Sequence, residues 1–168
     1  YADDTGTQPV TSYAQEPGTE QVKMNNLSAA YYMFAQGIPL VHAGEDMLRT
    51  KFNEKGVIIH NSYNSSDYVN KIRWSHLDTY DVYADTVEYY KGLIAFRKNH
   101  EAIRLAQPGD VSANVKSYLI DNGQIMLYSF APTSGEVSDG IITIYNAKTT
   151  DAQINIYDSN YSSLNIDE

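Results

Sequence analysis

The sequence predicts a mixed fold, α/β followed by all-β, in which a helix–strand–helix portion precedes a domain made of strands. Three observations predict it. Apolar residues recur at helical spacing over residues 19–36 and again over residues 85–100. Between these helices, residues 38–43 form a short, continuous apolar run of the kind found in buried parallel strands. From about residue 113 the apolar period changes to that of strands separated by turns.

The first helix has recognisable ends. Thr19 is a suitable N-cap, and Glu20 places a negative charge in the first turn. The helical pattern continues to about Gln36, and Gly37 is the residue type that commonly ends a helix. The strand predicted at Ile38–Ala43 follows directly, so the two elements form an αβ unit.

A long connection, residues 44–84, separates this strand from the second helix. Connections of this length inside compact domains are uncommon and are usually functional or disordered. Aromatic residues in the connection favour the functional alternative, because they can hold the loop against its domain. We expect Trp74 to have this anchoring role. For Tyr63, both anchoring and contact with a ligand stay open.

The second helix is predicted to begin at Asp85, where Glu88 three residues later completes a near capping box. After the helix, the segment Gln107–Asp110 contains Pro and Gly and interrupts the periodic pattern. We place a domain boundary there. The predicted domains are residues 1–105 and residues 106–168.

The second domain is predicted to contain four strands, at Val115–Ile120, Gln124–Phe130, Gly140–Asn146 and Ala152–Tyr157. The tripeptide Asp121-Asn122-Gly123 between the first two is typical of a hairpin turn. In the third strand, apolar residues occupy both sets of alternating positions. Both faces of the sheet should therefore be partly covered.

Composition and charge exclude several classes of protein. The chain has 168 residues, with 12 basic and 21 acidic side chains and a net charge of −9. Nucleic acids and anionic membranes bind basic surfaces, so neither is expected as a partner. The absence of cysteine excludes disulfides and thiolate metal sites. No apolar run approaches the roughly 20 residues that span a bilayer.

The predicted strand at residues 38–43 ends in Gly44, Glu45 and Asp46. The carboxyl end of a parallel strand is where α/β-barrel enzymes place their chemistry. Adjacent residues that leave a strand point in opposite directions, however, so these two carboxylates cannot easily flank one bond. We expect structural roles for them at the rim of the strand. Arg49 should pair with one of the two.

Three segments of the chain, in this order, resemble segments of one enzyme family. They are AQGIPLVHAGEDMLRTK at residues 35–51, NSYNSSDYVNKIRW at residues 61–74 and DTVEYYKGLIAFRKNHEAIRL at residues 85–105. They resemble the eighth barrel strand, the loop after it and the eighth helix of type I pullulanases, in glycoside hydrolase family 13 of the α-amylase superfamily. Residues 23–105 resemble these enzymes collinearly, and residues 113–158 resemble their C-terminal β-domain more loosely.

The resemblance implies both a fold and an activity. The fold is the last αβα portion of a (β/α)8 TIM barrel (helix 7, strand 8, a long loop and helix 8). A C-terminal antiparallel β-sandwich domain follows it, complete or incomplete in this chain. The activity is hydrolysis of α-1,6 branch linkages in pullulan, amylopectin and limit dextrins. The mechanism is retaining, in which two carboxyl groups lie about 5–5.5 Å apart.

The catalytic carboxylates of this family lie on barrel strands four, five and seven, before the segments that match here. The carboxylate of strand seven belongs to a His-Asp motif, and none of the four histidines of this chain is followed by Asp. We therefore expect the chain to be a C-terminal fragment with no catalytic residue. Made alone, it should have no pullulanase activity.

The loop at residues 61–74 is expected to contact the substrate. In the family, an Asp and, four residues later, often an Arg contact the sugar on the non-reducing side of the cleavage point. These positions correspond to Asp67 and Lys71, and lysine lacks the planar fork of arginine. Tyr63 and Asn64 complete the expected substrate-binding set.

No cofactor or metal is expected in this segment, and calcium in a full-length enzyme is left open because no ligand set is recognised. The expected partners are an α-glucan polysaccharide or oligosaccharide and the N-terminal part of the same barrel. A secreted or cell-surface location in a bacterium is expected, with the cytoplasm as the alternative. Two other interpretations stay open. One is a non-catalytic glucan-binding or adaptor module, and the other is a fragment of a related enzyme such as an isoamylase or an amylopullulanase.

Overall fold

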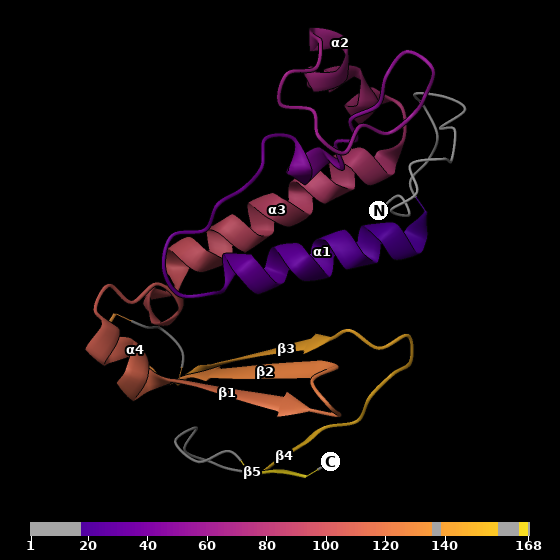
Figure 1. Ribbon diagram of the computed structural model, residues 1–168. Coiled ribbons are helices and arrows are strands. Elements are labelled where there is room, and N and C mark those ends of the chain that lie inside the picture. Colours follow the sequence, from indigo (N-terminus) through magenta and orange to yellow (C-terminus); the bar gives the residue numbers. More distant parts are fainter. Residues whose placement is uncertain (1–17, 136–138, 158–164, 168) are drawn as a thin grey trace. The chain divides into compact units, whose positions relative to one another are not determined.

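The computed structural model describes residues 18–135, 139–157 and 165–167. Figure 1 labels its helices and strands along the chain. The two longest helices are α1 (Thr19–Met33) and α3 (Asp81–Asn99). Within the described ranges, no helix is long and apolar enough to cross a membrane.

The chain divides into two compact units. The first combines the chain up to Asn26 with Leu40–Lys91, and the second combines Leu27–Pro39 with the chain from Gly92 onward. Helices α1 and α3 therefore each contribute residues to both units. The predicted division of the chain at residues 105 and 106 follows sequence composition and stays a prediction.

The first unit contains the long connection, which is held by short helical segments. These are the 3-10 helices η1 (Glu45–Met47) and η2 (Trp74–Asp78) and the short helix α2 (Asp67–Asn70). An isolated antiparallel bridge joins Phe52 to Ile58. The unit buries apolar side chains from these segments and from α3: Met47, Phe52, Val69, Tyr83 and Tyr90. The connection thus has a core of its own.

The strand predicted at Ile38–Ala43 is not formed by the described part of this chain on its own, and it stays a prediction. The segment forms neither a helix nor a paired strand in the part of the chain that the structure describes. The side chain of Ile38 is 98% exposed and that of Leu40 is 91% exposed, so the segment is not buried either. The physical reason is that a parallel strand exists only through hydrogen bonds to neighbouring strands, which local sequence cannot supply.

Helix α3 begins at Asp81, one turn before the predicted start at Asp85. Tyr83 in this extra turn is buried, and its ring centroid lies 5.1 Å from that of His76. This tertiary packing makes the additional turn favourable, whereas the capping pattern alone indicated a later start. The predicted end of the helix near Asn99 is confirmed.

The second unit contains a three-stranded antiparallel sheet in the order β1-β2-β3 (Figure 1). Its strands are β1 (Val115–Ile120), β2 (Ile125–Phe130) and β3 (Ile141–Asn146), which confirms the first three predicted strands. Ile120 pairs with Ile125 across the predicted hairpin turn. Asp121 and Asn122 both have positive φ there, as a tight turn of this type requires.

Two further elements of the second unit differ from the prediction. The fourth strand, β4 (Asn155–Tyr157), is shorter than predicted and pairs with β5 (Asn165–Asp167), which was not predicted. Helix α4 (Pro108–Asn114) occupies the segment that was expected to be a linker. Its proline lies at the first helical turn, where the missing N–H has no cost.

Both faces of the three-stranded sheet are covered. On one face, Phe130 and Ile141 lie opposite each other and are buried with Ala102 and Ile103 of the 3-10 helix η3 (Glu101–Ile103). Side chains that alternate with these point to the other face. One of them, Leu127, is fully buried. The expectation that both faces are partly covered is confirmed.

Arg97 of α3 holds the chain that leaves α1. Its guanidinium donates hydrogen bonds to four main-chain carbonyls, those of Met33, Ala35, Gly37 and Ile103. Carbonyls at the end of a helix lack partners within the helix, so a cationic fork is well suited to them. Gln36 adds a hydrogen bond from its amide nitrogen to the Ala102 carbonyl, at 2.8 Å.

Candidate functional site

The candidate site includes a tight turn at Gly44, which precedes the loop in the chain. Gly44 has φ of 87°, and its carbonyl accepts hydrogen bonds from the main-chain N–H groups of Met47 and Arg49 at 3.1 and 3.0 Å. A Cβ atom at this position would lie 2.7 Å from Cδ of Arg49. Glycine is therefore required here for two reasons, the backbone conformation and the close approach of Arg49.

Arg49 connects this turn to the loop that was expected to bind substrate. Its Nη1 donates to the carbonyl of Ala43 at 2.9 Å, and its Nη2 donates to the carbonyl of Asn70 at the end of α2. The prediction that Arg49 pairs with Glu45 or Asp46 is replaced by these main-chain contacts. Carbonyls at a helix end lack partners within the helix, so they are available to accept hydrogen bonds from the guanidinium.

Hydrogen bonds hold the carboxylate of Glu45 within the first unit. Its Oε2 accepts a hydrogen bond from the main-chain N–H of His42 at 3.3 Å, and its Oε1 accepts one from the hydroxyl of Tyr90 at 3.1 Å. The carboxylate is thus tied to the chain before the turn and to α3. Asp46 is partly buried in the same 3-10 helix.

Polar contacts of Asn70 and Lys51 hold the loop at residues 61–70, and the sequence analysis did not predict them. The amide nitrogen of Asn70 donates to the carbonyls of Ser62 and Ser65 at 2.8 and 3.1 Å. Lys51 Nζ donates to the hydroxyl of Ser62 at 2.9 Å. A signal was present, because an asparagine that follows a helical turn commonly bonds to nearby main chain. These contacts make residues 61–70 an ordered loop.

The four residues expected to bind substrate all lie exposed on this loop and its exit. Tyr63 is 84% exposed, and Asn64, Asp67 and Lys71 are exposed as well. Asp67 begins α2, and its carbonyl accepts a hydrogen bond from the N–H of Lys71 at 2.8 Å, so the two lie one helical turn apart. The loop therefore offers a carboxylate, an ammonium, an amide and a phenol to solvent. Such groups suit a ligand with many hydroxyls.

Arg73, not Trp74, anchors the exit of the loop. Arg73 is buried, its Cζ lies 4.2 Å from the ring centroid of Phe52, and its Nη2 donates to the carbonyl of Tyr68 at 2.8 Å. Trp74 is 67% exposed, so the anchoring role predicted for it is wrong. An arginine can stack on aromatic rings and bond main chain at the same time, which makes it the stronger anchor.

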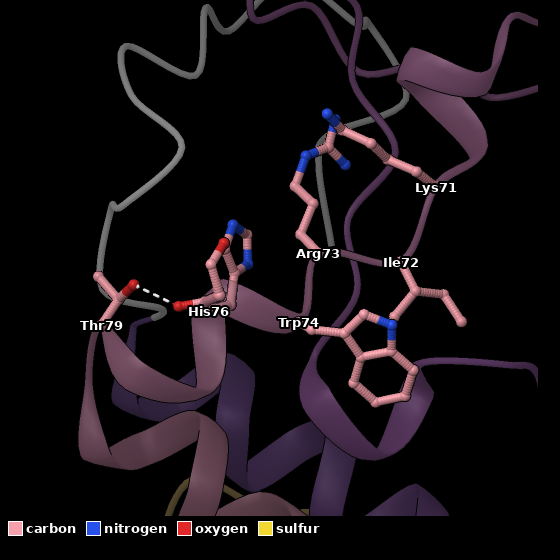
Figure 2. A pocket seen from close by; sticks show the side chains of 7 residues that line it. Lys71, Ile72, Arg73, Trp74, His76 and Thr79 are labelled. Carbon is pink, nitrogen blue, oxygen red and sulfur yellow. Dashed lines mark hydrogen bonds between the residues drawn. The ribbon is translucent and has the colours of Figure 1, made fainter.

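A cavity of about 380 Å³ lies at this exit (Figure 2). It is lined by Lys71, Ile72, Arg73, Trp74, Ser75, His76 and Thr79. Burial, and then the positive charge of Arg73, lower the pKa of His76 below its ordinary value. The Nε2 atom of His76 is buried and has no hydrogen-bond partner among the residues described.

No group of three or more His, Asp or Glu side chains capable of holding a metal ion occurs among residues 18–135, 139–157 and 165–167. The exposed side chains of the candidate loop offer hydrogen-bonding groups, charge and aromatic surface.

The sequence is similar to proteins of the starch-debranching class, although no family model matches the chain. A pullulanase of Bacillus subtilis (strain 168) is 35% identical over 102 residues, which cover 61% of this chain and 13% of that protein. An isoamylase of Flavobacterium sp is 35% identical over 103 residues, which cover 60% of this chain and 12% of that protein.

The structure matches solved pullulanases over most of its length. A mutant pullulanase from Paenibacillus barengoltzii complexed with maltotetraose gives a TM-score of 0.67 at 27% identity and covers 86% of this chain. The type I pullulanase from Bacillus subtilis str. 168 complexed with maltose gives 0.66 at 30% identity and covers 79% of this chain. This chain is pullulanase-like. The matches span 22% and 18% of those two solved chains, so the pullulanase-like chain corresponds to a small part of each relative.

Proposed function

We propose that this chain is part of a pullulanase-type glycoside hydrolase that removes α-1,6 branches from pullulan, amylopectin and limit dextrins with retention of configuration. The chain supplies a substrate-binding loop, in which Asp67, Lys71, Tyr63 and Asn64 contact the glucan. The observation that carries the proposal is the exposure of these side chains on a loop held by Arg49 and Asn70. The maltose and maltotetraose bound by the solved relatives support an α-glucan as the ligand.

The proposal assigns Ile38–Ala43 to the eighth strand of a (β/α)8 barrel and the strands after residue 114 to a β-sandwich. The exposure of Ile38 and Leu40 supports the first assignment, because large apolar side chains two positions apart would share one face of a strand and suit burial in a sheet. The partner that covers them is the N-terminal part of the same barrel. A polymer as large as pullulan does not cross membranes, which favours a secreted or cell-surface enzyme; an enzyme that acts on limit dextrins in the cytoplasm is the alternative.

The catalytic carboxylates come from that partner. None of the histidines in this chain begins a His-Asp pair, and Glu45 is engaged with His42 and Tyr90. The chain alone should therefore release no reducing sugar from pullulan. Release by the purified chain would contradict this part of the proposal.

A chimera tests the whole proposal. The matching segment of the Bacillus subtilis pullulanase is replaced by residues 23–157 of this chain, and hydrolysis of pullulan is measured. The chimera should be active. Asp67→Ala in the chimera should lower kcat/KM by roughly 10- to 100-fold, the effect of losing one or two hydrogen bonds from a charged group to a sugar.

The control is Glu54→Ala, which removes an exposed carboxylate from a turn elsewhere in the same unit. It should leave kcat/KM unchanged. Equal effects of the two substitutions would show that Asp67 is not a substrate contact, and an inactive chimera that folds would contradict the enzyme proposal.

Two exposed aromatic residues, Tyr63 and Trp74, favour one other candidate function, a non-catalytic glucan-binding module. Affinity electrophoresis in gels containing amylopectin distinguishes the two. A module that binds without the rest of a barrel should be retarded, whereas a barrel fragment with an incomplete site should migrate as it does without glucan. The chain is 35% identical both to a pullulanase and to an isoamylase, so sequence identity does not distinguish their linkage preferences. The activity of the chimera on pullulan tests this preference.

A further inference from the structure

The cavity at the exit of the loop has a charge opposite to that of the chain. Among residues 18–135, 139–157 and 165–167, its lining includes Lys71, Arg73 and His76 and no carboxylate. In the whole sequence, 21 acidic residues outnumber 12 basic ones. A local concentration of positive charge in an acidic protein indicates a site for an anionic group.

Two of these cations share one aromatic ring. Lys71 Nζ lies 5.1 Å and Arg73 Cζ lies 5.5 Å from the ring centroid of Tyr68. In Figure 2 the side chains of Lys71 and Arg73 extend to the same side of the cavity. Arg73 is held there by Phe52 and by the Tyr68 carbonyl. Both charged groups are thus kept on one part of the cavity lining, where an anion could contact both.

His76 adds a directed polar atom to this charge. Its lowered pKa, caused by burial and by Arg73, keeps the imidazole neutral at pH 7, so the ring has one N–H to donate. Its buried Nε2 has no partner within the described part of the chain. Buried polar atoms are nearly always hydrogen-bonded, so this atom is suited to an oxygen of a ligand.

Trp74 adds an apolar surface at the rim. Its exposed indole is a flat face of the kind on which the apolar face of a hexose can lie. The cavity volume of about 380 Å³ falls within the range of small-molecule sites, roughly 300–1,000 Å³. Lys71 belongs both to this cavity and to the loop proposed to contact glucan, so the two sites adjoin.

We propose that this cavity binds the phosphate monoester of a hexose phosphate. Lys71, Arg73 and His76 surround the phosphate, and Trp74 lies against the sugar. Charge-assisted hydrogen bonds from lysine and arginine to phosphate oxygens are strong and geometrically specific. The inference that the phosphate is attached to a sugar rests on the proposed function, in which an α-glucan binds to the adjoining loop. The same chemistry is carried by a free hexose phosphate and by a phosphate esterified to a glucan.

The chain contains a single tryptophan, Trp74, so tryptophan fluorescence, excited at a wavelength that the 15 tyrosines do not absorb, reports on the rim of this cavity. Titration of the full chain with glucose 6-phosphate should give a saturable change at concentrations at least about 10-fold below those needed for glucose. Inorganic phosphate should compete with glucose 6-phosphate. Phosphorylated maltotetraose distinguishes the sources: tighter binding than glucose 6-phosphate assigns the site to glucan-borne phosphate, and weaker binding assigns it to the free sugar phosphate.

Lys71→Met should weaken binding of glucose 6-phosphate by about 10-fold, as expected for one charge-assisted contact. Lys55→Met is the matched control, because Lys55 is an exposed lysine of the same unit outside the cavity. Far-UV circular dichroism of both variants verifies that they fold like the parent chain. The inference is overturned by the absence of a saturable response, by equal responses to glucose and glucose 6-phosphate, or by equal effects of the two substitutions.

The outcome is separable from that of the chimera. Hydrolysis of pullulan by the chimera with no response of Trp74 to glucose 6-phosphate overturns only the phosphate site. Loss of hydrolysis in a folded chimera, with the fluorescence response intact, overturns only the debranching proposal.

Discussion

The guanidinium of Arg49 donates a hydrogen bond to the carbonyl of Asn70, 21 residues further along the chain. This contact joins the turn at Gly44 to the end of α2. The side chain of Asn70 in turn holds the carbonyls of Ser62 and Ser65. The positions of the exposed residues of the candidate site thus depend on the side chains of Arg49 and Asn70.

Gly44→Ala should lower the unfolding free energy of the first unit by more than the strain of a positive φ alone, because two effects add. An alanine with φ near 87° costs roughly 1–2 kcal/mol, and its Cβ would also collide with Arg49. The matched control is Gly37→Ala, where φ is 90° and nothing lies within 4 Å of the added atom. Urea denaturation should show a larger loss of unfolding free energy for Gly44→Ala. Equal losses would mean that the Arg49 contact does not constrain this turn.

Asn70→Ala should loosen the loop while leaving α2 in place. The substitution leaves the carbonyls of Ser62 and Ser65 without their side-chain donor, at a cost of about 1–3 kcal/mol. Hydrogen exchange of amides in residues 61–70 should become faster than in the parent chain. Asn61→Ala, an exposed asparagine of the same loop, serves as the control and should leave exchange unchanged. The idea of a side-chain scaffold fails if both variants exchange alike.

Arg97→Met should be among the most damaging single substitutions in the second unit. It removes a charged donor from four carbonyls, and we expect a loss of roughly 2–4 kcal/mol in unfolding free energy. Lys98→Met replaces the neighbouring exposed cation and should change stability by less than about 0.5 kcal/mol. Similar midpoints for the two variants in thermal unfolding would contradict the role given to Arg97.

His76 should make the chain less stable in mild acid. Burial and Arg73 lower its pKa in the folded state, so between that pKa and the ordinary value of 6.5 the unfolded chain binds more protons. Stability contributed by the neutral ring is therefore present above pH 6.5 and is lost as the pH falls toward the folded-state pKa. His76→Gln should flatten this part of the stability curve, measured by urea denaturation at pH 7.5 and 5.5. His60→Gln, at an exposed site, is the control, and the same flattening in both would refute the assignment.

Elements that depend on local pattern could be predicted from the sequence. Val115–Ile120 was predicted to the residue, because alternating apolar positions and the Asp-Asn-Gly turn both act within a few residues. The end of α3 near Asn99 was also predicted, because it depends on local sequence. The four exposed residues of the candidate loop were named from a family resemblance, and their exposure agrees with a ligand-binding role.

The remaining features depend on contacts between distant residues. Ile38–Ala43 has the composition of a buried strand, yet composition does not provide a neighbouring strand. Arg73 is recognisable as an anchor only once Phe52, 21 positions earlier, is known to lie beneath it. Likewise, the four carbonyls that accept hydrogen bonds from Arg97 lie outside α3, so the helical period alone does not reveal them.

The exposed pair Ile38 and Leu40 also governs how the chain behaves during production. Large aliphatic side chains exposed to water are prone to self-association. Yield and monodispersity should therefore fall as protein concentration rises. Replacing Ile38 and Leu40 with threonine keeps a high β-propensity and removes the exposed apolar side chains. The variant should be easier to purify in soluble form.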